Sequence, residues 1–273
     1  MSGSQQFPVM RVLVLMALSA NAQAAVQGPP GSGMLGTMHD FSGEGYLVPV
    51  SGLQVGICSI CHTPHSAITT SLLWNQKLTT ATYTWGDASE THGGTPLPSS
   101  AHLGPSTKCL SCHDGSVAVG DTAVYYGMIG GKGAPGDTWD MGTLTVRLGA
   151  GGYGVGHVPS GSTVGDMSGN HPIAIPYPLN NSVGIYNNVR TGSRVDLTEF
   201  VANPNAPSHG IKLYTDDGTG KVSPGSAAGI TGIECTSCHD PHNKATVDTP
   251  FLRGMNTGST VGSGYLCLQC HIK

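Results

Sequence analysis

The sequence is poor in the side chains from which hydrophobic cores are usually built. Of its 273 residues, 38% are hydrophobic and 6% are aromatic, and only 4 are phenylalanine. Glycine (41 residues) and proline (18 residues), which interrupt regular helices and strands, are abundant instead. A chain of this length normally buries a continuous apolar core. We therefore expect either a loosely folded chain or a centre filled by something other than side chains.

An excess of basic residues is also missing. Lys and Arg number 12 against 16 Asp and Glu, which gives a net charge of −4. The sequence has no basic stripe and no stacking motif, so it gives no indication of nucleic-acid binding. The apolar run "VLVLMALSA" is too short to span a bilayer, and no later segment reaches that length. We expect the mature protein to have no membrane span.

The first residues have the pattern of an export signal. Arg11 precedes the apolar run from Val12 to Ala20, and the small residues Ala22 and Ala24 follow it in an A-x-A arrangement. This order is typical of a secretory signal peptide that is removed after export. The sequence therefore predicts a signal peptide over residues 1–25 and one exported domain over residues 26–273.

No cysteine is left over once one short motif has been counted. All eight cysteines fall into four C-x-x-C pairs, and a histidine follows each pair directly. The motifs are Cys58, Cys61 and His62; Cys109, Cys112 and His113; Cys235, Cys238 and His239; and Cys267, Cys270 and His271. C-x-x-C-H is the attachment signature of c-type haem: two thiols bond to the porphyrin and the histidine ligates its iron from below.

Zinc sites and disulfides are the alternatives for cysteines in such pairs. A pair of C-x-x-C motifs can bind zinc, but zinc does not require histidine at the next position. Four complete motifs behind an export signal favour four covalently bound haem c groups. The predicted fold is a multihaem cytochrome c: mostly loop, with short helices at the motifs, a few short strands and a core of stacked haems.

Each iron needs a second axial ligand besides its motif histidine. Four ligands are required, and eight further histidines are available: His39, His65, His92, His102, His157, His171, His209 and His242. Methionine ligands would raise the potential, and the candidates are Met34, Met38, Met128, Met141, Met167 and Met255. The surplus of histidine favours ligation by two histidines at every haem. Because such an iron has no open face, we expect electron transfer and no enzymatic activity.

The spacing of two histidines predicts that neighbouring haems share one segment. In "CTSCHDPH", His242 follows His239 by three residues, which places both on the same side of a helical turn. A second axial ligand must approach from the opposite face of the porphyrin, so His242 is expected to ligate a different haem. "CSICHTPH" repeats the arrangement with His62 and His65.

A long insert separates the two halves of this internal repeat. It covers about residues 114–234, is rich in glycine, and contains no cysteine. The alternating stretch "LTVRL" predicts a short strand, and the insert is expected to drape over the haems or to form a contact surface. His171, fixed beside a proline, is a candidate axial ligand within it, and His39 beside Asp40 is a candidate near the mature N-terminus.

Several motifs together resemble a known family. "CxxCHTPH", "LLWN", "CLSCHDGSVAV", "NHPI" and "CTSCHDPHN" are similar to those of the paired-CxxCH tetrahaem c-type cytochromes of metal-reducing bacteria. The resemblance implies that the second axial ligands are His39, His65, His171 and His242. One departure is Gln76, which stands where members of this family often have histidine. Some members polymerise into extracellular filaments (nanowires), in which one axial histidine comes from the neighbouring subunit. His39 is the donor we expect.

The expected function is electron transfer as the repeating subunit of a conductive extracellular filament. Its partners would be further copies of the chain, redox proteins and extracellular electron acceptors. A monomeric periplasmic electron shuttle is the alternative. A multihaem reductase is a third possibility, but it needs an iron with an open face.

Overall fold

The computed structural model describes twelve stretches of the chain. They are residues 29–37, 39–41, 57–69, 71–99, 104–114, 116–117, 124–125, 128–129, 164–206, 210–249, 251–258 and 264–272. The predicted signal peptide, the "LTVRL" stretch, and His102, His157 and His209 lie outside these residues. No helix in the described ranges is long and apolar enough to cross a membrane.

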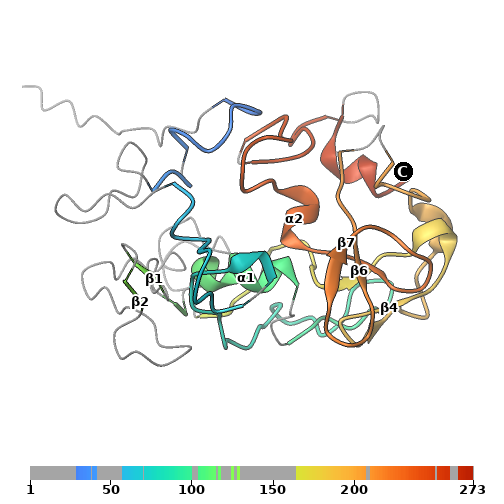
Figure 1. Cartoon of the computed structure of the whole chain (residues 1–273). Coiled ribbons are helices and arrows are strands. Elements are labelled where there is room, and N and C mark those ends of the chain that lie inside the picture. The colour runs from blue at the N-terminus through green and yellow to red at the C-terminus, as the bar shows by residue number, and fades with distance from the viewer. Residues whose placement is uncertain are drawn as a thin grey trace, which may run out of the picture.

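Helices are few and short (Figure 1). The longest, α1 (Pro105–His113), begins with proline, whose missing N–H is not needed in a first helical turn. It ends at Asp114, whose N–H donates to the carbonyl of Leu110. Helix α2 (Cys235–Cys238) is a single turn. The 3₁₀ turns are η2 (Ser71–Leu73), η4 (Leu179–Asn181), η5 (Leu197–Glu199) and η7 (Leu266–Gln269).

The insert contains the largest sheet in the described part of the chain. Four antiparallel strands lie in the order β3-β8-β6-β7. Their bounds are β3 (Ile175–Pro176), β6 (Tyr214–Asp216), β7 (Val222–Pro224) and β8 (Thr231–Ile233). Two-stranded antiparallel pairs are formed by β4 (Ile185–Tyr186) with β5 (Val189–Arg190), and by β1 (Val124–Tyr125) with β2 (Met128–Ile129).

Strand β8 leads directly into the third C-x-x-C-H motif. Its central residue, Gly232, packs under the ring of Tyr186, and a Cβ atom at this position would lie 2.3 Å from the ring Cγ. The absence of a side chain therefore lets Tyr186 sit against the strand. The Tyr186 hydroxyl donates to Oε1 of Glu234 at 2.6 Å, in the residue that joins β8 to α2. This packing fixes the position from which α2 begins.

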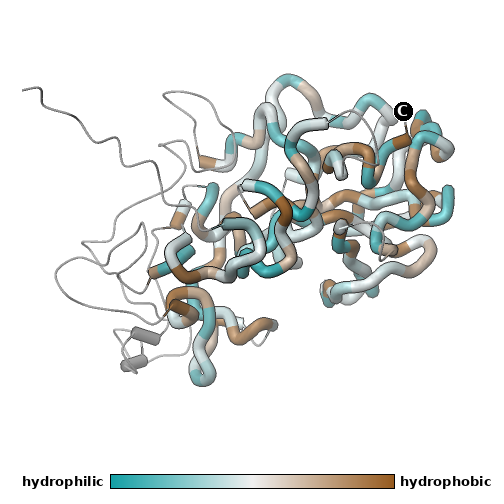
Figure 2. Tube along the Cα trace, turned by 90° about the horizontal axis from the view of Figure 1, so that it is seen from above, coloured by the Kyte–Doolittle hydropathy of each residue, from teal (hydrophilic) through white to brown (hydrophobic). Residues whose placement is uncertain are grey.

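Apolar packing among the described residues includes small clusters. One centres on Tyr177, Leu179, Ile211 and Leu213, and a second centres on Tyr83, Leu110 and Met167. In Figure 2, hydrophobic and hydrophilic stretches alternate along the trace on both sides of the molecule. Many fully buried side chains are polar, among them Gln76, Asn75, Glu234 and Asn243. The described residues thus form a fold in which side-chain hydrogen bonds accompany limited apolar burial.

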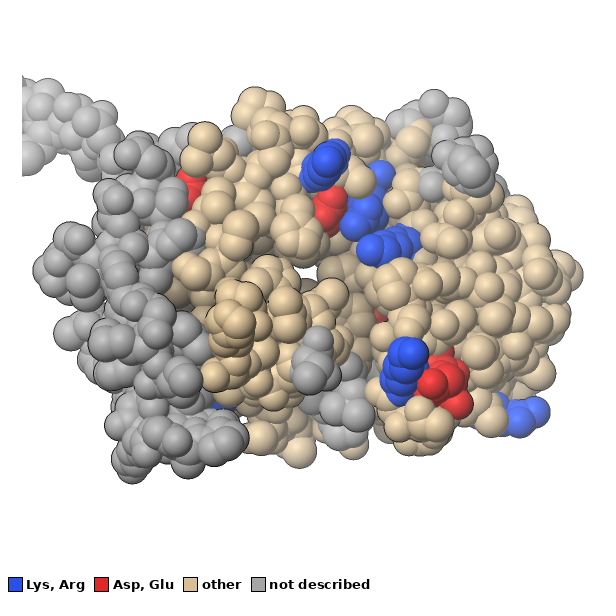
Figure 3. Space-filling view, in the orientation of Figure 1, with Lys and Arg blue, Asp and Glu red and all other residues tan. Residues whose placement is uncertain are grey.

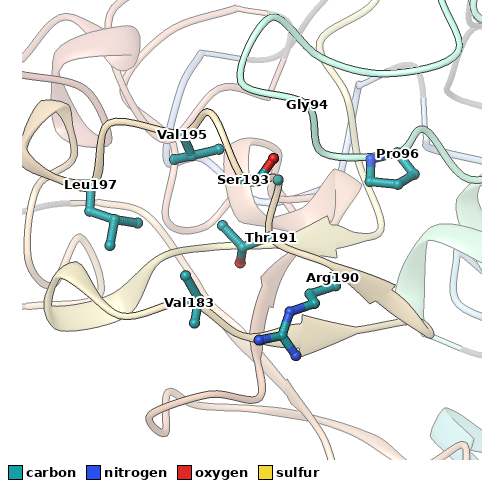
Figure 4. A pocket seen from close by; sticks show the side chains of 9 residues that line it. Gly94, Pro96, Val183, Arg190, Thr191, Ser193, Val195 and Leu197 are labelled. Atoms are coloured by element: carbon teal, nitrogen blue, oxygen red, sulfur yellow. The ribbon is translucent and has the colours of Figure 1, made fainter.

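The surface carries few charges and is hollowed. Figure 3 shows scattered Lys, Arg, Asp and Glu side chains on one face, and an opening near its centre. A separate open pocket of about 520 Å³ is lined by residues around β5 and η5, including Arg190, Thr191, Val195 and Leu197 (Figure 4). None of its lining residues belongs to a C-x-x-C-H motif or is a predicted axial ligand.

Candidate haem-attachment sites

Each C-x-x-C-H motif folds as one helical turn. The motif histidine donates its backbone N–H to the carbonyl of the first cysteine, four residues earlier. These bonds are His62 to Cys58 at 2.8 Å, His239 to Cys235 at 3.0 Å and His271 to Cys267 at 2.9 Å, while helix α1 spans the Cys109–His113 motif. The turn brings the two thiols and the imidazole of each motif together. All eight cysteines are free thiols in the structure.

Three of the four motif histidines lie beside a predicted second ligand of the same chain. The ring centroids are 6.0 Å apart for His113 and His39, 6.2 Å for His62 and His242, and 6.3 Å for His271 and His171. In each pair the two residues come from segments far apart in the sequence. The chain therefore brings together imidazoles that neither local spacing nor one helix would join.

The separation within these pairs fits an iron held between two imidazoles. A metal–nitrogen bond to histidine is about 2 Å long, so two such bonds on opposite sides of one ion place the ring centroids about 6 Å apart. Ordinary aromatic pairs also fall between about 4.5 and 7 Å. The distinguishing observation is that all three contacts join a motif histidine to a candidate axial ligand, at separations within 0.3 Å of one another.

Hydrogen bonds also orient several of these rings. Nδ1 faces a backbone carbonyl in His39 (Pro241 O, 3.2 Å), His62 (Leu72 O, 2.6 Å) and His171 (Pro172 O, 2.8 Å). Because a carbonyl only accepts hydrogen bonds, Nδ1 is the protonated nitrogen in each bonded ring. Nε2 then keeps its lone pair, which is the arrangement that metal-ligating histidines adopt.

His39 is held in an environment that keeps it neutral. Its ring stacks on Phe251 with centroids 4.8 Å apart and planes 14° apart. Burial, followed by the nearby His113, lowers the pKa of His39 to about 4. The imidazole is therefore uncharged at neutral pH, and only the neutral form has a nitrogen lone pair to give to a metal.

One buried donor near the first motif has no acceptor. Nε1 of Trp74 is buried without a hydrogen-bond partner among the described residues, and its ring meets His62 edge-on with centroids 5.9 Å apart. A buried N–H of this kind needs an acceptor that the described residues do not supply. The propionate groups of a haem bound at His62 are acceptors of this kind. The first motif therefore fits the group that its sequence predicts.

The attachment cysteines of successive motifs lie close enough to affect one another. The interacting thiols are Cys61 with Cys112, Cys109 with Cys235, and Cys238 with Cys270. A hydrogen bond with Cys109, together with burial, raises the pKa of the Cys235 thiol. The motifs are thus arranged in sequence order, the first beside the second, the second beside the third and the third beside the fourth.

A buried polar cluster joins the second and third motifs. Glu234, which is 1% exposed, accepts the backbone N–H of Ser106 at the start of α1 through Oε2 at 3.0 Å. Ser106 in turn accepts the N–H of Cys235 at 2.9 Å. The N–H of Glu234 donates to Ser237 at 2.9 Å, which closes a capping box around α2. This cluster was not predicted from sequence, because its glutamate and serine stand in the reverse of the usual capping-box order.

The remaining candidate ligands lie in different surroundings. His65 is exposed, and no ring of another described histidine packs against it. His39 lies beside His113 of its own chain, and its expected donation to a neighbouring subunit stays a prediction. Within the described residues, no group of three or more His, Cys, Asp or Glu side chains is arranged to hold a bare metal ion.

Comparison of the chain with models of known protein families found no match, and comparison with curated proteins found none either.

Proposed function

We propose that this chain is an electron-transfer protein with four covalently bound haem c groups, most of them ligated by two histidines. The observation that carries the proposal is the set of three imidazole pairs, each joining a motif histidine to a distant histidine at 6.0 to 6.3 Å. When bound, haem c supplies the reversible one-electron chemistry of its iron.

The residues of the chain have three separate tasks in this proposal. The eight cysteines attach the porphyrins, and the row of neighbouring thiols sets the order of the sites from the first motif to the fourth. The paired histidines would hold an iron between them and would leave it no coordination position for a substrate. Backbone carbonyls hold the Nδ1 proton of His39, His62 and His171. This combination favours electron transfer over a reductase.

The exported protein should show this ligation in its spectra. We expect a mass increase equal to four haems, and low-spin oxidised haem at the first, second and fourth motifs even at dilutions where the chain is monomeric. Mass spectrometry and electron paramagnetic resonance measure the two properties. Fewer than four haems, or mainly high-spin iron, would contradict the proposed function.

We further propose that the chain polymerises and that His65 is an axial ligand to a haem iron of the neighbouring subunit. His65 is exposed. Nearby, Leu72 and Leu73 are 60% and 48% exposed, although each is a large apolar side chain. The N–H of Thr63 donates to the carbonyl of Leu73, which closes this segment into one loop. A second copy of the chain would cover the apolar side chains and offer an iron to the imidazole.

Replacing His65 with alanine should therefore prevent polymerisation while leaving the three histidine pairs intact. Negative-stain microscopy and sedimentation velocity would show monomers, and the low-spin signals of the first, second and fourth haems would remain. His92→Ala, at another exposed histidine, is the matched control and should polymerise normally. Filaments of the His65→Ala protein would exclude His65 as the shared ligand. A wild-type chain that stays monomeric would support the alternative, a periplasmic shuttle.

A further inference from the structure

One short loop contains or contacts histidines that belong to the predicted haem sites of three motifs. The junction loop, residues 239–246, begins with the motif histidine His239. It also contains His242, whose ring lies beside His62 of the first motif. The carbonyl of Pro241 accepts the Nδ1 proton of His39, whose ring lies beside His113 of the second motif. The geometry of this loop therefore bears on the first, second and third haem sites together.

The segment that carries His39 is docked on the same loop. This strap comprises residues 29–37 and 39–41, and its backbone is bonded to a part of the chain more than 200 residues away. Gly31 donates its N–H to Oγ1 of Thr246 at 2.8 Å, and Gly33 donates its N–H to the carbonyl of Asn243 at 3.0 Å. Figure 1 shows the strap in blue, beside the orange segment that follows α2.

The side chain of Asn243 makes more of the hydrogen bonds to the strap than any other residue of the loop. Its Nδ2 donates to the carbonyls of Pro29 at 2.9 Å and Gly33 at 3.0 Å, and it lies 3.3 Å from Oγ of Ser32. The apolar contribution of the strap is small by comparison, since Leu35 is 69% exposed and Phe41 is its buried aromatic residue. Polar bonds to Asn243 therefore account for much of what holds the strap in place.

Asn243 is itself fixed in the orientation that this role requires. It is 2% exposed, and Thr246 Oγ1 donates to its Oδ1 at 2.5 Å, which directs Nδ2 toward the strap. Its φ of 50° lies in the left-handed region, where asparagine is tolerated better than most residues. Asp240 holds the loop around it by accepting the N–H groups of His242, Lys244 and Ala245 at 3.2, 3.2 and 2.6 Å.

We propose that Asn243 is a positioning residue that latches the N-terminal strap to the junction loop and so keeps His39 on the iron of the haem attached at Cys109 and Cys112. The proposal rests on the proposed function, because it requires haem at the second motif. The hydrogen bonds of the Asn243 side chain go to Pro29, Ser32, Gly33 and Thr246, not to His39. Its effect on ligation passes through the strap backbone and the Pro241 carbonyl.

The test is the change Asn243→Gly in the full-length, haem-loaded protein. Glycine accepts the positive φ without strain, so the variant removes the amide contacts alone. We expect a high-spin signal of up to one haem in four, its return to low-spin on addition of imidazole, and faster proteolysis of the strap. Asn188→Gly is the matched control, since Asn188 is exposed and has a φ of 58°. It should leave the spin state unchanged.

Two further variants separate the possible failures. His39→Ala should give the full one-in-four high-spin signal. Thr246→Val removes the hydroxyl that orients Asn243 and should give a smaller signal. It provides the test if the Asn243→Gly protein does not fold. An unchanged spin state in Asn243→Gly and Thr246→Val, with a high-spin signal in His39→Ala, would overturn the latch and leave the proposed function standing. A wild-type protein without low-spin haem would overturn the proposed function itself.

Discussion

Replacing His242 with alanine should convert the iron held by His62 from six-coordinate, low-spin to five-coordinate, high-spin. His242 is the described histidine whose ring faces His62, with centroids 6.2 Å apart and planes 19° apart. Loss of the imidazole leaves that face of the iron open, and an alanine methyl group has no lone pair to replace it. About a quarter of the total haem should therefore change spin state, since the sequence provides four attachment motifs.

Electron paramagnetic resonance of the oxidised protein measures this change, and added imidazole should reverse it. A newly open iron should also bind small ligands such as carbon monoxide in the reduced state, which the wild-type first site should not do. His92→Ala is the control, because His92 is exposed and belongs to none of the three pairs. A His242→Ala protein with only low-spin haem would show that another residue ligates the first iron.

The chain should not fold when haem is withheld. The described residues hold two small apolar clusters, built on four and three buried side chains, and the longest helix has nine residues. Many of the other buried side chains are polar and need their hydrogen-bond partners to be in place. The free energy of binding a group that is absent from the unfolded chain becomes part of the folding free energy. Without the four haems, we expect that contribution to be missing.

Expression of residues 26–273 in a cytoplasm that lacks haem-attachment enzymes tests this expectation. The product should lack near-ultraviolet circular dichroism and should be digested rapidly by protease, while the exported, haem-loaded protein resists it. Replacing Cys267 and Cys270 with serine in the exported protein gives an intermediate case with one haem fewer. A cooperative unfolding transition in the haem-free chain would show that the side chains alone suffice for folding.

The parts of the site that depend on local sequence were predictable. A C-x-x-C-H motif closes one helical turn by a bond between residues four apart, so its geometry needs no distant partner. The helical turn expected to hold His239 and His242 together is absent, because α2 ends at Cys238 and His239 is extended, yet His242 still lies beside His62 of another motif. The candidates His39, His171 and His242 were selected from their neighbours, and the structure places each beside a motif histidine. Whether haem is bound there stays a prediction.

The pairing of these histidines was not predictable, because it depends on contacts between distant segments. The contact of His39 with His113 of the same chain is an example: the strap that carries His39 is bonded to Asn243 and Thr246, and nothing near residue 39 indicates that contact. Short strands were expected in the insert, but the four that form its sheet could not be located from the sequence. Its strands have two or three residues each, too few to show an alternating pattern.

The docking of the strap has a consequence for how the protein is made. A chain is synthesised from its N-terminus, so residues 29–33 emerge long before Asn243 and Thr246 exist to receive them. Throughout that interval His39 has no Pro241 carbonyl to orient it. A haem at the second motif, if bound as proposed, could be attached to its cysteines early but would acquire its distant histidine only after about nine-tenths of the chain has been produced. If haem binds as proposed, maturation has a late step, and truncation between residues 113 and 243 should yield a product with an incompletely ligated second iron.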